Sequence, residues 1–307
     1  MRARVGIEGR GETRGVTQVL VSTTPSPNLS SPFGPRGPEG RGVRANPARL
    51  RGWPRVLLLS IAALLMLLMV LPLFAIAIRA APTLGEALLQ EDVGTTLQLT
   101  AWTSVIAVLV IIALGTPTAW LIARKQIRGW KILDAVLDLP VVLPPAVAGI
   151  GLLFAFGRRG LLGPVLSSLG IELAFSTAAV VIAQVFVAAP LYIRAAVIGL
   201  RRIDEDLESV AMVEGATTWQ VFRFVTLPLS SSALITGAVL AWARALGEFG
   251  ATILFAGNFV GRTQTMSLAI YINFQSDTNI ALALALVLVI VSLAVLLLVR
   301  WLARSEE

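Results

Sequence analysis

The sequence predicts an all-α membrane protein with six transmembrane helices, and three observations support this fold class. The chain of 307 residues is 56% hydrophobic and only 14% charged, with a mean hydropathy of +0.81, whereas about a quarter of the residues of an average soluble domain are charged. Six uncharged stretches approach or exceed the roughly 20 residues that cross the hydrocarbon core of a bilayer. Basic residues gather in alternate connections between these stretches, which is typical of a multispanning topology.

The uncharged stretches give the expected positions of the spans. The second is long enough to tilt or to protrude from the bilayer, and Pro117 predicts a bend near one of its ends. The fifth runs on past a charged pair, Arg244 and Glu248, to about Ala256. In chain order, the six expected spans are 56–78, 93–123, 139–157, 173–193, 224–256 and 278–299.

The distribution of basic residues predicts that both termini are cytoplasmic. Nineteen Lys and Arg residues lie on the side that carries the termini, including ten Arg among residues 1–55. The opposite side carries only Arg79, Arg158, Arg159 and Arg262. Because cytoplasmic loops are enriched in Lys and Arg, this asymmetry predicts an N-in, C-in, multi-pass protein of the cell inner (plasma) membrane.

Residues 1–50 form a basic tail that precedes the six-span domain of residues 51–307. The tail is rich in Gly, Pro, Arg and Ser and has no periodic apolar pattern, so it cannot bury enough surface to offset its chain entropy and is expected to be disordered. It also lacks the continuous apolar run of a signal peptide. Beside a membrane, its charge indicates a cytoplasmic flank and not a nucleic-acid reader. A regulatory role and a dispensable extension both stay open.

The residues that the chain lacks exclude several chemistries. There is no Cys and no His, which excludes thiol nucleophiles, Cys metal sites and the His-based triad. The two lysines, Lys125 and Lys131, do not follow the glycine of a phosphate-binding GxxxxGK[ST] loop. We therefore expect no catalytic residue, no metal and no cofactor in this chain, and no nucleic-acid partner.

A polar loop, residues 201–227, separates the fourth and fifth spans and carries a spaced motif. Gly215 is followed by nine residues, Val225, one residue and then Leu227-Pro228. This spacing resembles the cytoplasmic coupling loop of ABC-importer permeases, in which Glu-Ala-Ala, three residues, Gly, nine residues, Ile, one residue and Leu-Pro form the docking element for an ATPase subunit. The coupling residues that the resemblance implies are Glu208, Ser209, Ala211, Gly215, Ala216, Val225, Leu227 and Pro228.

The loop departs from the family pattern in its opening Glu-Ala-Ala. The expected Glu falls on Ser209, with Glu208 one place earlier, and the first Ala falls on Val210, while Ala211 and Gly215 match. Ala211 is small enough for close packing, Gly215 can adopt the positive φ of a turn between two short helices, and Pro228 suits the first turn of the next helix. The alternative is an ordinary amphipathic helix at the membrane interface.

The fifth span carries polar groups that a lipid-facing helix would avoid, so it is expected to line the interior of the bundle. Arg244 and Glu248 lie one helical turn apart and can neutralise each other. They are either a gate or a structural ion pair. A stripe of small residues on the same span predicts close helix packing, and it comprises Ala233, Gly237, Ala241 and Ala245. The polar residues of the span are Ser230, Ser231, Ser232, Thr236, Arg244, Glu248 and Thr252.

The third span contains three prolines that must interrupt helical hydrogen bonding: Pro140, Pro144 and Pro145. Such a break is tolerated in a membrane only where protein or water satisfies the freed backbone groups. Arg158 and Arg159 follow on the outer side. They either attract an anion or an acidic partner, or they anchor the helix at the interface.

Longer runs sharpen the resemblance. VLPPAVAGIGLLFAFGRRGLLG (142–163), ARALGEFGATILFAGN (243–258) and TQTMSLAIY (263–271) look like molybdate permease subunits of ABC importers, and the likeness covers about residues 56–303. It implies a type I ABC-importer permease fold and import of a tetrahedral oxyanion, molybdate first, with tungstate or sulfate as alternatives within the same group. Under this resemblance, candidates for the translocation path or gate are Pro144, Pro145, Ser231, Thr236, Arg244, Glu248 and Thr252, and those for the outer mouth are Arg158, Arg159 and Arg262.

The same resemblance implies the partners. They are a second copy of the chain, two ATPase subunits that bind ATP and Mg, and an extracytoplasmic binding protein that delivers the anion. A stand-alone secondary anion transporter or channel is the alternative from another class. Such proteins often carry intramembrane acids for ion coupling, and Glu248 is the deep acid in this chain.

Overall fold

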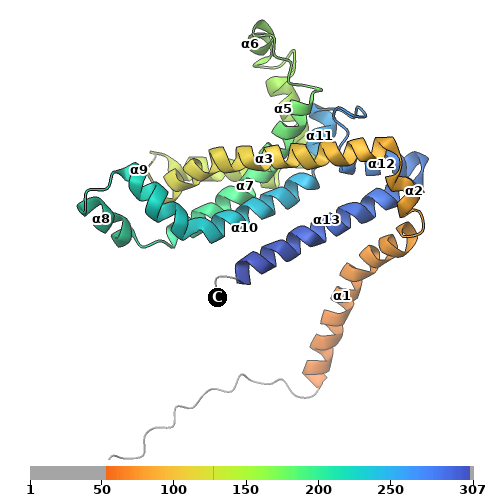
Figure 1. Cartoon of the computed structure of the whole chain (residues 1–307), viewed down its shortest axis with the longest axis horizontal. Coiled ribbons are helices and arrows are strands. Elements are labelled where there is room, and N and C mark those ends of the chain that lie inside the picture. The colour runs from red at the N-terminus through yellow and green to blue at the C-terminus, as the bar shows by residue number, and fades with distance from the viewer. Residues whose placement is uncertain (1–52, 127, 305–307) are drawn as a thin grey trace, which may run out of the picture. The chain divides into compact units, whose positions relative to one another are not determined.

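The computed structural model describes residues 53–126 and 128–304, and this part of the chain is helical and contains no strands (Figure 1). The tail of residues 1–50 lies outside the described residues. Residues from Leu58 onward form one compact unit. The helices are α1 (Trp53–Ala80), α2 (Leu84–Leu88), α3 (Glu91–Ala123), α4 (Trp130–Val142), α5 (Pro145–Phe156), α6 (Gly163–Ser168), α7 (Thr177–Arg201), α8 (Glu205–Val213), α9 (Thr218–Val221), the π-helix η1 (Phe222–Thr226), α10 (Leu227–Leu246), α11 (Gly250–Phe255), α12 (Met266–Ser276) and α13 (Thr278–Arg304).

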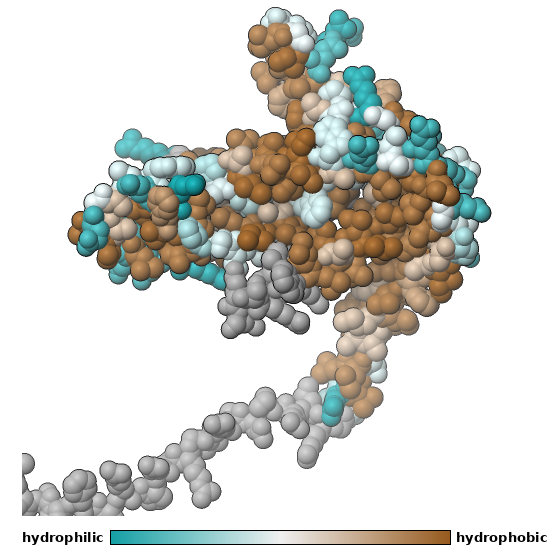
Figure 2. All heavy atoms as spheres, in the orientation of Figure 1, coloured by the Kyte–Doolittle hydropathy of each residue, from teal (hydrophilic) through white to brown (hydrophobic). Residues whose placement is uncertain are grey.

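Five continuous helical segments are long and apolar enough to cross a membrane. They are α1, α3, α7, the run from α9 through α10, and α13. The expected first, second, fourth and sixth spans are therefore confirmed. Pro117 lies inside α3, which continues through it to Ala123. Figure 2 shows apolar surface across the middle of the visible face, with polar residues near α8 and at the end that carries α2 and α12.

The third expected span is two helices and not one. α4 and α5 meet at an angle of 116°, so this pair forms either one broken span or a re-entrant segment. Leu143 and Pro144 both have extended backbones, with ψ of 136° and 132°, as favoured for a residue that precedes proline. The predicted interruption is therefore confirmed at Pro144-Pro145. It is wrong for Pro140, which lies inside α4.

The fifth expected span also ends earlier than the sequence suggested. α10 stops at Leu246, and a short α11 begins at Gly250, so residues up to Ala256 do not continue one helix. The chain leaves the helix at Gly247 and places Glu248 between the two elements. The Glu248 side chain then accepts a hydrogen bond from the backbone N–H of Ala251 (2.8 Å), which satisfies one of the free donors at the start of α11.

The centre of the bundle is α7, which packs most extensively against α10 and α3. The small-residue stripe of α10 makes this possible: a methyl group at Gly237 would lie 2.9 Å from the Cβ of Ala195 on α7, and Ala241 and Ala245 are buried. The predicted close approach along this stripe is confirmed. The Tyr192 and Thr116 hydroxyls, 2.5 Å apart, add a polar contact between α7 and α3.

Candidate functional site

The loop between α7 and α10 folds as two short helices joined at Gly215. Gly215 has a φ of +94°, which confirms the predicted left-handed turn. Its N–H donates to the carbonyl of Met212, and the N–H of Ala216 donates to the carbonyl of Ala211, both at 3.0 Å. This is a Schellman motif, which closes a helix by satisfying its last carbonyls. Ala211, which matches the family pattern, and Ala216 are thus the two ends of one hydrogen bond.

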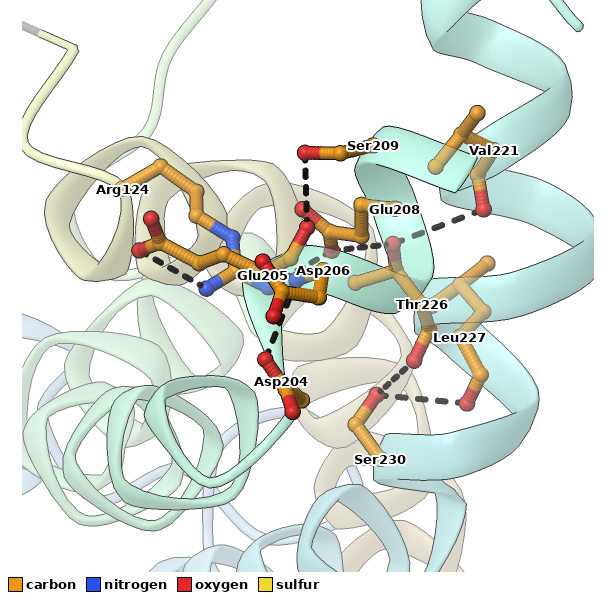
Figure 3. Close-up of polar contacts among 10 residues, drawn as sticks. All are labelled: Arg124, Asp204, Glu205, Asp206, Glu208, Ser209, Val221, Thr226, Leu227 and Ser230. Carbon is orange, nitrogen blue, oxygen red and sulfur yellow. Dashed lines mark hydrogen bonds and ion pairs between the residues drawn. The ribbon is translucent and has the colours of Figure 1, made fainter. Parts of the chain in front are cut away.

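Glu208 is the polar centre of this loop (Figure 3). Its Oε1 accepts hydrogen bonds from Nη2 of Arg124 at 2.6 Å and from Oγ1 of Thr226 at 2.7 Å. The side chains of Arg124 and Glu208 are 8% and 14% exposed, so this ion pair is largely shielded from water. One carboxylate therefore joins the end of α3, the helix α8 and the helical segment that leads into α10.

Ser209 faces away from this junction. It is exposed, and its hydroxyl donates to the carbonyl of Glu205 at 2.9 Å. The carboxylate of α8 that reaches Arg124 and Thr226 is therefore that of Glu208, one place before the position of the family Glu. The carboxylate of Glu205 lies 3.6 Å from Arg124 but its side chain is 80% exposed, so that second ion pair contributes little.

Pro228 lies in the first turn of α10, as the sequence predicts, although α10 continues from α9 without a break. The chain is helical from Thr218 to Leu246, with the π-helical turn η1 just before α10, and Pro228 is the second residue of α10. Since proline has no N–H to donate to the preceding turn, the wider π turn accommodates it. An open hollow of about 400 Å³ lies on the surface of the loop, and Gly215, Ala216 and Val225 help to line it.

The other candidate site forms where the two broken helices meet. A Cβ at Gly250 of α11 would lie 2.7 Å from the Cβ of Pro145, and one at Gly149 of α5 would lie 2.8 Å from the carbonyl oxygen of Ala251. The break that contains Glu248 thus adjoins the break at Pro144-Pro145. Glycines allow this contact because any side chain would collide with the opposite backbone.

Arg244 and Glu248 form the ion pair expected from their spacing. Nη1 of Arg244 lies 2.9 Å from Oε2 of Glu248, and the two side chains are 34% and 1% exposed. The backbone carbonyl of Glu248 accepts a hydrogen bond from the Ser267 hydroxyl at 2.6 Å. The acid is therefore fully enclosed, whereas the guanidinium reaches a surface of the single chain. The role of the pair as a gate stays a prediction.

The remaining path candidates do not all lie here. Thr252 is buried on α11, and its hydroxyl has no hydrogen-bond partner among the residues that the structure describes. Thr236 lines a separate open hollow of about 700 Å³ between α7 and α10. Ser231 is exposed on α10 and does not line that hollow. The structure thus brings together Pro144, Pro145, Arg244, Glu248 and Thr252 and leaves Ser231 and Thr236 apart.

Two of the three outer-mouth candidates share a pocket. Arg158 and Arg262 line a cavity of about 350 Å³ together with Glu172 and Phe175, whereas Arg159 does not line it. The Thr177 hydroxyl donates to the carbonyl of Arg262 at 2.9 Å and so fixes the backbone of that loop to the start of α7.

Sequence reasoning missed a charge cluster between α4 and α7. Arg194 donates from Nη1 to Asp134 at 2.6 Å and from Nε to Asp138 at 2.7 Å, with a further bond from Nη2 to Asp138. The sequence spacing could have predicted this cluster, because Asp134 and Asp138 are four residues apart and lie on one face of a helix. Asp138 and Arg194 served only as limits of the expected spans 139–157 and 173–193.

A buried polar seam along α3 was missed as well. The backbone N–H of Met266 donates to the Thr100 hydroxyl at 2.8 Å, and the Trp242 indole donates to Ser104 at 3.0 Å. The hydroxyl residues of α3 recur at about one helical turn, and this spacing could have predicted the seam. Across residues 53–126 and 128–304, no group of three or more acidic side chains gathers in a way that could hold a metal ion.

Residues 115–306 match the sequence profile of the family described as "Binding-protein-dependent transport system inner membrane component". The chain belongs to this family. It is thus the membrane permease subunit of an ABC importer, and such subunits are not themselves enzymes.

Curated relatives and solved structures agree with this assignment. The chain is 39% identical to "Probable transport system permease protein NifC" of Clostridium pasteurianum over 82% of this chain and 88% of that protein. It is 42% identical to "Molybdenum transport system permease protein ModB" of Mycobacterium tuberculosis over 75% of this chain and 86% of that protein. A crystallised bacterial ABC transporter that imports alginate has a similar fold, with a TM-score of 0.62 at 16% identity, covering 82% of this chain and 95% of that one.

Proposed function

We propose that this permease imports a tetrahedral oxyanion, molybdate, across the inner membrane. The observation that carries this proposal is the 42% identity to a molybdenum permease over three quarters of the chain. Tungstate and sulfate have the same geometry and charge as molybdate. The ATPase rate measured with each anion separates molybdate from sulfate.

The coupling loop supports an ATPase partner. Its two short helices are held to α3 and α10 through Glu208, so a push on α8 is transmitted to two spans at once. We assign the loop to the cytoplasmic face, in line with the excess of basic residues on that side. Two ATPase subunits, which bind ATP and Mg, dock there, and an extracytoplasmic binding protein delivers the anion to the side that carries Arg158 and Arg262.

A second copy of the chain accounts for the exposure of Arg244. A guanidinium on a membrane helix with a 34% exposed side chain is costly against lipid and is stable facing protein or a water-filled cavity. In a homodimer, this surface of α10 lies next to the path. The path holds hydroxyls and one already paired Arg, which suits weak binding and release of the anion, while the binding protein selects it.

We expect molybdate-loaded binding protein to stimulate ATP turnover of the assembled complex. The reason is that the loaded, closed binding protein is the form that the outer face of the permease receives. Sulfate, which has the same charge on a smaller tetrahedron, should stimulate poorly with the same partner. The measurement is the ATPase rate in proteoliposomes with each anion. Equal or greater stimulation by sulfate would move the chain to the sulfate branch of its group.

A further inference from the structure

Three cations surround one indole ring at the end of the bundle that carries α8. Nζ of Lys125, Nζ of Lys131 and Cζ of Arg201 each lie 5.9 Å from the centroid of the Trp130 ring. They come from three segments: the end of α3, the start of α4 and the end of α7. All three are exposed, and none pairs with a carboxylate among the ion pairs of the described residues.

Lys125 has a strained backbone conformation. Lys125 has a φ of +52°, in the left-handed region that an L residue with a side chain rarely adopts. Its N–H donates to the carbonyl of Ile122 at 3.2 Å, and that of Gln126 to Leu121 at 3.1 Å. This is the same Schellman ending that closes α8, where the left-handed position is Gly215. α3 thus places a lysine at a position that favours glycine.

The surroundings of the cluster are those of a membrane interface. The cations lie at the ends of membrane-crossing helices, and Trp is enriched at the level of the lipid headgroups. α4 leads away from Trp130 with large exposed apolar side chains: Ile132, Val136 and Leu139 are 72%, 51% and 53% exposed. Positive charge at the headgroup level, beside an apolar helix face that acyl chains can cover, matches a phospholipid with an anionic headgroup.

We propose that Lys125, Lys131 and Arg201 around Trp130 form a binding site for the phosphate-bearing headgroup of an anionic phospholipid. The cations neutralise the headgroup, the ring supports them, and the acyl chains follow the apolar face of α4. The neighbouring α8 begins with the acidic residues Asp204, Glu205 and Asp206, so the charge of the Trp130 cluster is distinct from that of the coupling helix. The site is independent of the anion that is transported.

The test is titration of the full-length permease with phosphatidylglycerol and phosphatidylcholine of equal chain length, followed by native mass spectrometry. Phosphatidylglycerol is expected to bind at least tenfold more tightly, and each cation removed should reduce this preference about fivefold. Inorganic phosphate at the same concentration should not displace the lipid, because it lacks the acyl chains. Displacement by inorganic phosphate, or an equal affinity for the two lipids, would overturn the proposal.

Matched variants separate lipid binding from folding. Lys125→Gly removes a cation and relieves the left-handed strain, so its melting temperature should equal or exceed that of the wild type while its lipid preference falls. Arg202→Gln is the control, because Arg202 is exposed one residue after Arg201 but lines the hollow between α7 and α10 instead. Loss of ATPase co-purification in Lys125→Gly and Lys131→Gln, with the lipid preference intact, would make the cluster a contact for the ATPase and contradict the proposal.

Discussion

Replacing Glu248 with glutamine is expected to destabilise the permease by roughly 3 kcal/mol, the lower end of the range for breaking a buried ion pair, and to stop most of its transport. Glu248 is 1% exposed, and its two oxygens bind Arg244 and the N–H of Ala251. Glutamine can keep the bond to Ala251 but leaves the charge of Arg244 uncompensated. The lower end applies because the Arg244 side chain keeps a third of its surface exposed.

A double-mutant cycle separates pairing from general damage. Arg244→Met leaves a buried carboxylate alone, whereas the double variant Arg244→Met/Glu248→Gln leaves no unpaired charge. We expect the double variant to be less destabilised than the sum of the two single variants by about 1 kcal/mol or more. Melting temperatures in detergent and anion uptake are the measurements. Losses that simply add would show that the two residues act independently.

Glu208→Gln is expected to reduce the ATP turnover stimulated by the binding protein about tenfold while leaving the permease folded in the membrane. The carboxylate holds α8 against Arg124 and Thr226, and a hydrogen bond to a charged group contributes about 1.5–3 kcal/mol. Without it, α8 can shift relative to α3 and α10, so that movement of the ATPase no longer reaches the spans. ATPase co-purification and turnover of the reconstituted complex measure the effect.

Two neighbouring positions provide controls for this prediction. Glu205→Gln removes an acid from the same helix whose side chain is 80% exposed and 3.6 Å from Arg124, so turnover should stay close to that of the wild type. Ser209→Glu restores the family residue on the exposed side of α8. It should not rescue Glu208→Gln, and rescue would show that position 209 reaches the junction after all.

The positions of the helix breaks could be predicted in part. The Leu143-Pro144-Pro145 sequence favours a break, since the residue before each proline is biased away from the helical conformation, but this rule does not set the 116° angle between α4 and α5. Pro140 does not end α4, because a membrane helix can continue with a single missing N–H. The break at Glu248 was hidden, because it arises from a side chain that replaces backbone bonds at the start of α11.

Paired charges made the ends of the spans hard to predict. The fourth span was expected to end at residue 193, yet α7 runs to Arg201, because Asp134 and Asp138 of α4 neutralise Arg194. An uncharged stretch marks a span only when its flanking charges are unpaired. For the same reason the sequence could not decide between Glu208 and Ser209: the partner that settles it, Arg124, is 84 residues away in the chain.

The most direct measurement is molybdate uptake into proteoliposomes that contain the permease, its ATPase subunits and the binding protein on the outer face. The account predicts uptake that requires ATP and Mg on the side of the α8–α9 loop and that disappears when the ATPase subunits are omitted. Uptake by this chain alone, driven by an ion gradient without ATP, would contradict the account and make the chain a secondary transporter.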